Sequence, residues 1–154
     1  LYTDAIAGWF VENVGDDWME LRSRLMRLLH DEAELDEIVK LVGMDALSAT
    51  DRLKLEAARS IREDFLHQNA FHEIDTYTPL EKQYLLIKLV LHYYDEAVSA
   101  LEKGADIEKL VSLPVREQIG RYKYVPAESI KYEYNHILDE IAGQIQELLQ
   151  KEDY

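Results

Sequence analysis

Residues 43–77 read GMDALSATDRLKLEAARSIREDFLHQNAFHEIDTY, and the rest of the chain is organised around this stretch. Gly43 stands where a helical pattern stops, as expected of a glycine that ends a helix in the left-handed conformation. Ser48 is a typical N-cap, and the carboxylate of Asp51 in the first turn suits the helix dipole. Apolar residues then recur every four positions, which predicts one helix over 49–68 with a single apolar stripe. The stripe consists of Leu53, Ala57, Ile61 and Phe65.

The helix predicted over 49–68 is a rod about 30 Å long at 1.5 Å per residue. The next residues, Asn69-Ala70-Phe71-His72, follow neither a helical nor a strand period. We therefore expect the Ser48 turn and the Phe71 loop to lie at opposite ends of one rod. Charged residues on its polar side can pair along the helix, each pair contributing a few tenths of a kcal/mol: Arg59 or Arg62 with Glu56 or Glu63.

The chain as a whole is acidic and free of cysteine. It has 154 residues, 47% of them hydrophobic, with 17 Lys and Arg against 31 Asp and Glu and a net charge of −14. That size fits one domain with a substantial core. The negative field repels nucleic acid and anionic membrane surfaces, and the absence of Cys excludes disulfides and thiolate sites. No apolar run reaches the ~20 residues of a membrane-spanning helix, so we expect no membrane insertion.

A second amphipathic helix precedes this stretch. It follows a short helix predicted over 4–14, and either Asp16 or Asp17 can cap it. One apolar stripe, interrupted only by Glu32, runs along it: Leu21, Leu25, Leu28, Leu35, Val39 and Val42. The first residues do not form a signal peptide. Because the chain begins at Leu1 rather than Met, we expect it to be a piece of a longer polypeptide.

The second half of the chain predicts one more long helix, two short ones and a final helix. Thr78-Pro79-Leu80-Glu81 combines a cap, a proline at the first helical position and a capping-box Glu, and this helix should end at Gly104. Its inward residues are Tyr84, Ile87, Leu91, Tyr94, Val98 and Leu101. Leu113-Pro114 divides 105–125 into two short helices, and Pro126 opens the last helix, whose repeat suits antiparallel packing. The last stripe is Ile130, Tyr134, Ile137, Ile141, Ile145 and Leu148.

These patterns predict an all-α fold, a single compact bundle over 1–154 of about four long and two or three short helices. The sequence contains no GxxxxGK[ST] motif, no strand followed by a glycine-rich turn and helix, and no Cys or His cluster at zinc spacing. We therefore expect no ATPase activity from this chain alone, since it lacks the usual means of holding phosphates.

Four segments carry a family resemblance: Leu1-Tyr2-Thr3-Asp4-Ala5-Ile6, IREDFLHQNAF at 61–71, Asp75-Thr76-Tyr77 and Glu81-Lys82-Gln83-Tyr84. In this order, over residues 1 to about 124, the chain resembles the C-terminal helical domain of the catalytic A subunit of archaeal-type and vacuolar-type rotary ATPases. The resemblance implies that a nucleotide-binding P-loop domain precedes residue 1. It also implies a parent subunit that uses ATP or ADP with magnesium and couples hydrolysis or synthesis to proton or sodium transport.

The resemblance further implies two sites. Gln68, Asn69, Ala70 and Phe71 would form the adenine side of the nucleotide pocket, where a ring can stack on a purine and amides can hydrogen-bond. The turn formed by Asp45, Ala46, Leu47, Ser48, Ala49, Thr50 and Asp51 would bear on the central rotor stalk, mainly through steric bulk. From composition alone, the commoner reading puts Phe71 in the core and makes Leu47 and Ser48 an ordinary staple and cap.

The partners implied by the resemblance are the chain's own nucleotide-binding domain, the non-catalytic B subunit and the central stalk subunits, with no nucleic acid. The location implied is cytoplasmic, peripheral to the membrane, in the soluble head of the complex. One alternative is a purely structural helical interaction module without nucleotide contact.

A metal-binding oxidase is a second alternative, because Glu133-x-x-His136 and Asp64-x-x-His67 resemble di-iron ligand spacing. Such spacing arises easily by chance in an acidic chain, and we expect no metal site. Arg121-Tyr122-Lys123-Tyr124 mixes bases with rings as single-strand binders do, but a packed or interface-facing tyrosine pair is the favoured interpretation.

Overall fold

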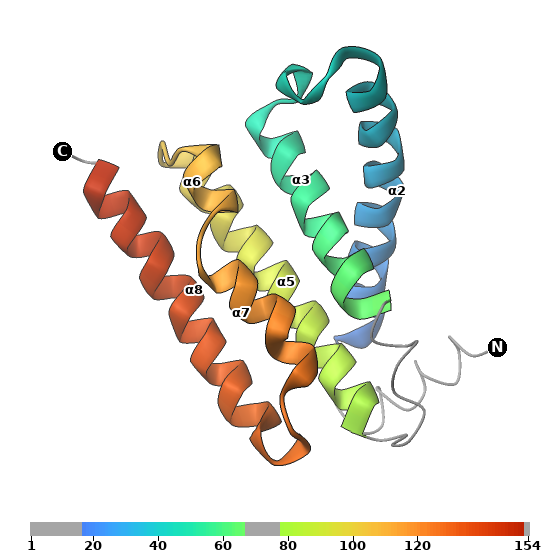
Figure 1. The fold of residues 1–154 in the computed structure, drawn as a ribbon, viewed down its shortest axis with the longest axis vertical. Helices are drawn as coiled ribbons and strands as arrows, with labels where there is room; N and C mark the ends of the chain where they lie inside the picture. The colour runs from blue at the N-terminus through green and yellow to red at the C-terminus, as the bar shows by residue number, and fades with distance from the viewer. Residues whose placement is uncertain (1–16, 67–77, 153–154) are drawn as a thin grey trace.

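The computed structural model describes the backbone of residues 17–66 and 78–152, and the side chains of 17–63 and 80–151. In these ranges every regular element is a helix, which confirms the all-α prediction (Figure 1). The α-helices are α2 (Trp18–Val42), α3 (Ala49–Ser60), α5 (Thr78–Glu102), α6 (Ile107–Val111), α7 (Val115–Arg121) and α8 (Ile130–Glu152). The remaining elements are the 3₁₀ turns η1 (Met44–Ala46), η3 (Tyr122–Tyr124) and η4 (Ala127–Ser129), and the π-helix η2 (Ile61–Leu66). The helix predicted over 4–14 lies outside the described residues.

The helices stack side by side around α5. Helices α2 and α3 form an antiparallel hairpin on one side, and α8 covers the other side of α5 (Figure 1). The short helices α6 and α7 pack against α3, α5 and α8 and close the gap between the two halves. None of the described helices is long and apolar enough to cross a membrane.

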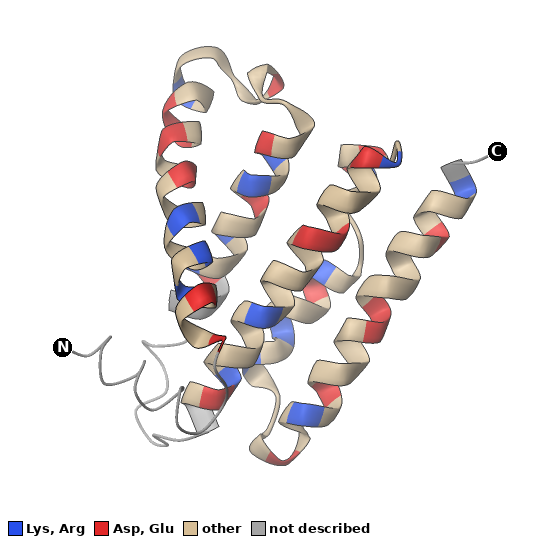
Figure 2. Cartoon of the chain, turned by 180° about the vertical axis from the view of Figure 1, so that it is seen from behind, with Lys and Arg blue, Asp and Glu red and all other residues tan. Residues whose placement is uncertain are grey.

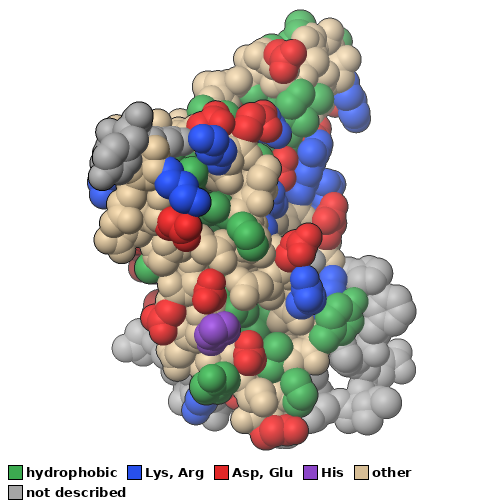
Figure 3. Space-filling view, turned by 60° about the vertical axis from the view of Figure 1, so that its left-hand side comes forward, with side chains coloured by type: hydrophobic (Ala, Val, Ile, Leu, Met, Phe, Trp, Pro, Cys, Tyr) green, Lys and Arg blue, Asp and Glu red, His purple; other side chains and the backbone are tan. Residues whose placement is uncertain are grey.

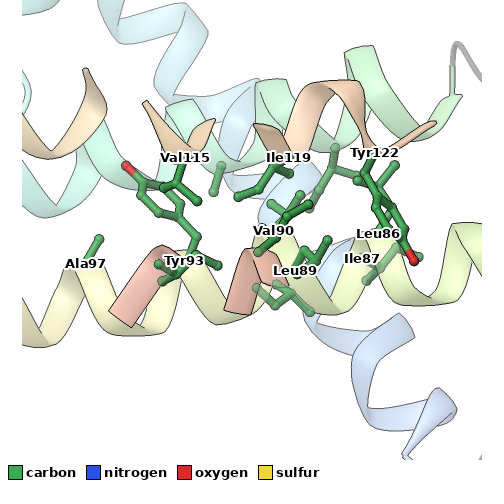
Figure 4. Close-up of a cluster of buried hydrophobic side chains, with 14 of the residues drawn as sticks. Leu86, Ile87, Leu89, Val90, Tyr93, Ala97, Val115, Ile119 and Tyr122 are labelled. Carbon is green, nitrogen blue, oxygen red and sulfur yellow. The ribbon is translucent and has the colours of Figure 1, made fainter. Parts of the chain in front are cut away.

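Helix α5 is the core of the bundle, and it is buried around most of its circumference. The predicted stripe holds for Tyr84, Ile87 and Leu91, whereas Tyr94 and Leu101 are only half-buried. Other buried residues of α5 fall outside that stripe: Leu85, Leu86, Leu89, Val90, Tyr93, Ala97 and Ala100. Several of them meet Val115, Ile119 and Tyr122 of the next segment (Figure 4). A helix apolar on all sides is stable only when neighbours surround it, and here α3, α7 and α8 do so.

Helix α8 confirms the seven-residue stripe but begins later than predicted. Ile130, Ile137, Ile141, Ile145 and Leu148 are all buried, and Tyr134 is half-buried. Pro126 does not open the helix, because its backbone is extended at ψ 153° and the turn η4 intervenes. The break at Leu113-Pro114 is confirmed, with α6 ending before it and α7 beginning directly after it.

Helix α2 buries most of its predicted stripe but not the last turn. Val39 is half-buried and Val42 is exposed, so the prediction that both line the core was wrong for Val42. The reason is that the stripe's final turn lies at the free end of the α2–α3 hairpin (Figure 1). Glu32, the one polar interruption of the predicted stripe, is itself buried.

The rod predicted over 49–68 is α-helical only to Ser60 and continues as a π-helix to Leu66. Leu53, Ala57 and Ile61 are buried as expected, and the side chain of Phe65 lies outside the described ones. The expected charge pairing along this rod was wrong. Arg52 pairs with Glu108 of α6. The other three basic residues pair with acids of α2, because the antiparallel hairpin places the two charged faces together: Lys54–Asp31 at 3.9 Å, Arg59–Asp36 at 3.5 Å and Arg62–Glu32 at 3.0 Å.

Candidate functional site: the tip of the α2–α3 hairpin

The tip of the hairpin is a tight turn defined by backbone hydrogen bonds. Gly43 ends α2 with φ 91°, and its N–H donates to the Val39 carbonyl at 2.9 Å. A side chain at that φ would be strained, so glycine is needed there. The 3₁₀ turn η1 follows, and Leu47 leaves it in an extended conformation with its N–H donating to the Met44 carbonyl at 3.1 Å.

Ser48 caps α3 as predicted. Its Oγ accepts a hydrogen bond from the N–H of Asp51 at 3.1 Å, and its carbonyl accepts from Arg52 at 2.9 Å. Arg52 also bonds through its guanidinium to the Glu108 carboxylate at the start of α6. The first turn of α3 is therefore anchored to the rest of the bundle, and the tip projects from a fixed base.

All seven residues of the predicted rotor-contact turn lie together at this tip. Exposed members are Asp45, Ala46, Ser48 and Thr50, and half-buried members are Leu47, Ala49 and Asp51. The half-buried Leu47 is compatible with both interpretations of the sequence, a staple for the turn and a contact for a partner.

The tip also carries an exposed apolar patch that the sequence prediction missed. Leu41 is 81% exposed, Val42 is 66% exposed and Ile38 is also exposed. Figure 3 shows hydrophobic side chains beside acidic and basic ones at this upper end of the molecule. Ile38, Leu41 and Val42 lie three and four positions apart, on one face of the helix, so their exposed side chains form one patch, and large exposed apolar patches mark contact sites. A signal was available, since Ile38 and Leu41 fall off the buried stripe of α2.

Charges of both signs are intermixed on the hairpin (Figure 2), and Lys54 and Arg59 of α3 pair with Asp31 and Asp36 of α2. The Glu32–Arg62 pair joins α2 to η2, at the opposite end of the rod from the tip. Burial raises the pKa of Glu32, an effect only partly offset by Arg62. The four predicted adenine-side residues, Gln68, Asn69, Ala70 and Phe71, follow η2 in the chain and lie outside the described residues.

The two tyrosines of the 121–124 segment are placed differently. Tyr122 is fully buried and its hydroxyl donates to the Ile130 carbonyl at 2.8 Å, whereas Tyr124 is 71% exposed. A hollow of about 280 Å³ lies beside this segment, lined by Gln118, Arg121, Val125, Tyr132, Glu133, His136 and Ile137. His136 stacks on Tyr132, with 6.5 Å between ring centroids.

Within the described residues, no group of three or more His, Asp or Glu side chains could hold a metal ion. Glu133 and His136 therefore have no cluster of further ligands there. The partner motif extends to His67, which lies outside the described residues.

The helices and the exposed apolar hairpin tip define an all-α helical module in the part of the chain that the structure describes. Residues 7–111 match the sequence model of the C-terminal domain of V and A type ATP synthase, and the chain belongs to that family. The resemblance drawn from the sequence segments is thereby confirmed.

Relatives extend this match to nearly the whole chain. It is 57% identical over 152 residues, 99% of its length, to the V-type ATP synthase alpha chain of Acetivibrio thermocellus. It is 54% identical over 151 residues to the V-type ATP synthase alpha chain of Clostridium botulinum (strain Okra / Type B1), and 53% identical over 150 residues to that of Thermoanaerobacter pseudethanolicus. The chain spans about a quarter of the length of these relatives, 26%, 25% and 25% respectively.

Proposed function

We propose that this chain is the C-terminal part of the catalytic subunit of a proton- or sodium-translocating rotary ATP synthase or ATPase, and that it couples ATP hydrolysis or synthesis to rotation. The observation that carries the proposal is the exposed apolar tip of the α2–α3 hairpin, together with membership of the family. The relatives' printed name and the chain's share of their length support a parent subunit with a nucleotide-binding P-loop domain before residue 1.

The proposed partners are that domain, the non-catalytic B subunit and the central stalk. ATP or ADP with magnesium would be held by the P-loop domain, and Gln68, Asn69, Ala70 and Phe71 would complete the adenine side. The location proposed is the cytoplasmic face, in the head of the complex and peripheral to the membrane.

The mechanism requires that displacement at one end of the α3–η2 rod reaches the other end. Eighteen residues of helix span about 27 Å at 1.5 Å per residue, although a π-helical segment is somewhat shorter. Ion pairs to α2 and to α6 brace this rod along its length. Nucleotide binding beside 67–77 would shift the η2 end, and the tip would press on the stalk through the apolar bulk of Leu41, Val42 and Leu47.

Cross-linking in the assembled enzyme tests the tip contact. The chain has no cysteine, so a Ser48→Cys variant carries one thiol in this part of the subunit. Coupled to a short thiol-directed photo-cross-linker, it is expected to capture a central stalk subunit. Tyr124→Cys, on another exposed surface, is the matched control and should capture no stalk subunit. Capture from both positions, or from neither, would refute the proposed contact.

A second arm separates this function from the purely structural alternative. Phe71→Ala in the assembled enzyme is expected to raise the KM for ATP about tenfold, because a stacked aromatic ring contributes roughly 1–3 kcal/mol. An unchanged KM with intact assembly would favour a structural module without nucleotide contact.

A further inference from the structure

Arg116, in the first turn of α7, donates hydrogen bonds to residues of both α3 and α6. Its Nη1 donates to Glu56 Oε2 at 2.9 Å and to the Val111 carbonyl at 3.0 Å. Its Nη2 donates to Ser60 Oγ at 2.9 Å and to the Glu56 carbonyl at 3.3 Å. The side chains of Arg116 and Glu56 are 21% and 20% exposed, so solvent screens this pair less than it screens the exposed pairs.

The same guanidinium lies over the ring of Tyr93 in α5, 5.8 Å from its centroid. Tyr93 is buried, and its hydroxyl donates to the Leu110 carbonyl at 2.7 Å. Burial raises the pKa of Tyr93 to about 12, so this hydroxyl remains a donor at neutral pH. Tyr93 and Arg116 therefore donate to the carbonyls of Leu110 and Val111, the last two residues of α6. The last carbonyls of a helix have no partner within the helix, so donors from other elements must bind them.

The two residues of α3 that Arg116 binds lie at the end of that helix. Glu56 and Ser60 are four residues apart on one face, and Ser60 is the last α-helical residue before the π-helix η2 begins at Ile61. A planar guanidinium can bind a carboxylate and a hydroxyl one turn apart at the same time, which a lysine ammonium on a flexible stem does less well. Arg116 thus binds the last turn of α3, directly before the α-helix becomes a π-helix.

Helix α7 is itself held from the far side of the bundle. The N–H of Val115, next to Arg116, donates to Gln144 Oε1 of α8 at 2.9 Å. Gln144 is fixed in turn by a 2.9 Å hydrogen bond from its Nε2 to Glu140. A continuous set of polar contacts therefore joins α8 through α7 to the end of α3.

We propose that Arg116 is a positioning residue that fixes the η2 end of the α3–η2 rod against α5, α6 and α7. Its part in coupling rests on the proposed function of that rod. Arg116 lies outside residues 7–111, the range matched by the family model, so the restraint is supplied by a segment beyond that pattern. Without it, the α3–η2 junction keeps its contacts to α2 but loses the hydrogen bonds that Arg116 donates to Glu56 and Ser60.

Amide hydrogen exchange in the assembled enzyme tests the restraint directly. Arg116→Gln is expected to speed exchange over residues 57–66 about tenfold and to leave α2 unchanged. Arg121→Gln is the matched control, because Arg121 lies on the same helix, is 72% exposed and pairs with Glu117 of α7 itself. Ser60→Ala, which removes a single acceptor, should give a smaller increase over the same residues and guards against poor folding of the Arg116 variant. Unchanged exchange over 57–66 in both the Arg116 and Ser60 variants would overturn the proposal.

The number of ions transported per ATP hydrolysed is a second readout, and general destabilisation of the enzyme does not change it. Loss of folded enzyme lowers ATP hydrolysis and ion transport in proportion, whereas a mispositioned rod lowers the ions moved per ATP hydrolysed. Arg116→Lys, which keeps the charge but loses the planar fork, is expected to reduce that ratio at least twofold. An unchanged ratio for Arg116→Lys and Arg116→Gln would refute the coupling role. The stalk contact is judged separately by the Ser48→Cys cross-link, so failure of this inference and failure of the proposed function can be told apart.

Discussion

Tyr122 and Tyr124 offer a matched pair for testing what holds the second half of the bundle together. They lie two residues apart in η3, yet Tyr122 is fully buried and Tyr124 is 71% exposed. The Tyr122 hydroxyl donates to the Ile130 carbonyl at 2.8 Å, at the first residue of α8. Tyr122→Phe removes that hydrogen bond and leaves the ring in place.

The expected cost follows from what the hydroxyl leaves behind. A typical intramolecular hydrogen bond contributes about 1 kcal/mol net, and an orphaned buried partner costs up to about 3 kcal/mol. The Ile130 carbonyl has a second lone pair and stands in the first turn of a helix, where it also accepts the bond four residues on. Tyr122→Phe should therefore lower the free energy of unfolding by about 1 kcal/mol. Tyr122→Ala, which also empties the ring's site, should cost about 3–5 kcal/mol.

Urea denaturation followed by far-ultraviolet circular dichroism measures these differences, with the slope of the transition as a check that the unfolded state is unchanged. Tyr124→Phe and Tyr124→Ala are the controls and should stay within about 0.5 kcal/mol of the parent chain. Equal effects at the two positions would refute the reasoning, because they would show that neither burial nor the Ile130 hydrogen bond distinguishes the tyrosines. A stable Tyr122→Ala variant would refute the assigned core.

Two further predictions concern pH and backbone conformation. Burial raises the pKa of Tyr84 and Tyr122 above the usual range and that of Tyr93 to about 12, so the folded state keeps protons that the unfolded state loses from about pH 10. Stability should thus be full below pH 10 and fall as pH rises toward 12, with a shallower fall in Tyr122→Phe; a flat urea midpoint across this range would contradict it. Gly104→Ala should destabilise by about 1 kcal/mol, because its φ is 98°, whereas Gly143→Ala in α8 should stabilise by about 0.5–1 kcal/mol. Thermal melts of both variants check this, and shifts of the same sign would contradict the backbone assignment.

The helices themselves were predictable because their signals are local. The Ser48 cap, the breaks at Gly43 and Leu113-Pro114, and the apolar repeat of α8 each depend on residues within a few positions of one another. The α5 stripe was only partly right, because one amphipathic face was expected of a helix that neighbours surround. The change from α to π winding after Ser60 had no signal in residue spacing alone.

The candidate site divides in the same way. Its turn, 45–51, was identified from the resemblance and lies at an exposed tip, but the apolar patch of Ile38, Leu41 and Val42 was not foreseen. Periodicity places an apolar residue on a helix face, but it does not say where along the helix the covering neighbour ends. Val42 was assigned to the core for that reason.

Sequence by itself determined where most helices begin and end, which family the chain resembles, and the lack of a phosphate-binding motif. Tertiary structure decided which of two tyrosines is buried, which acids the basic residues of α3 meet, and that Arg116 reaches Glu56 across 60 positions of chain. The physical reason is that helix formation depends on neighbours three or four residues apart. Burial and ion pairing depend instead on surfaces brought together only when the helices pack.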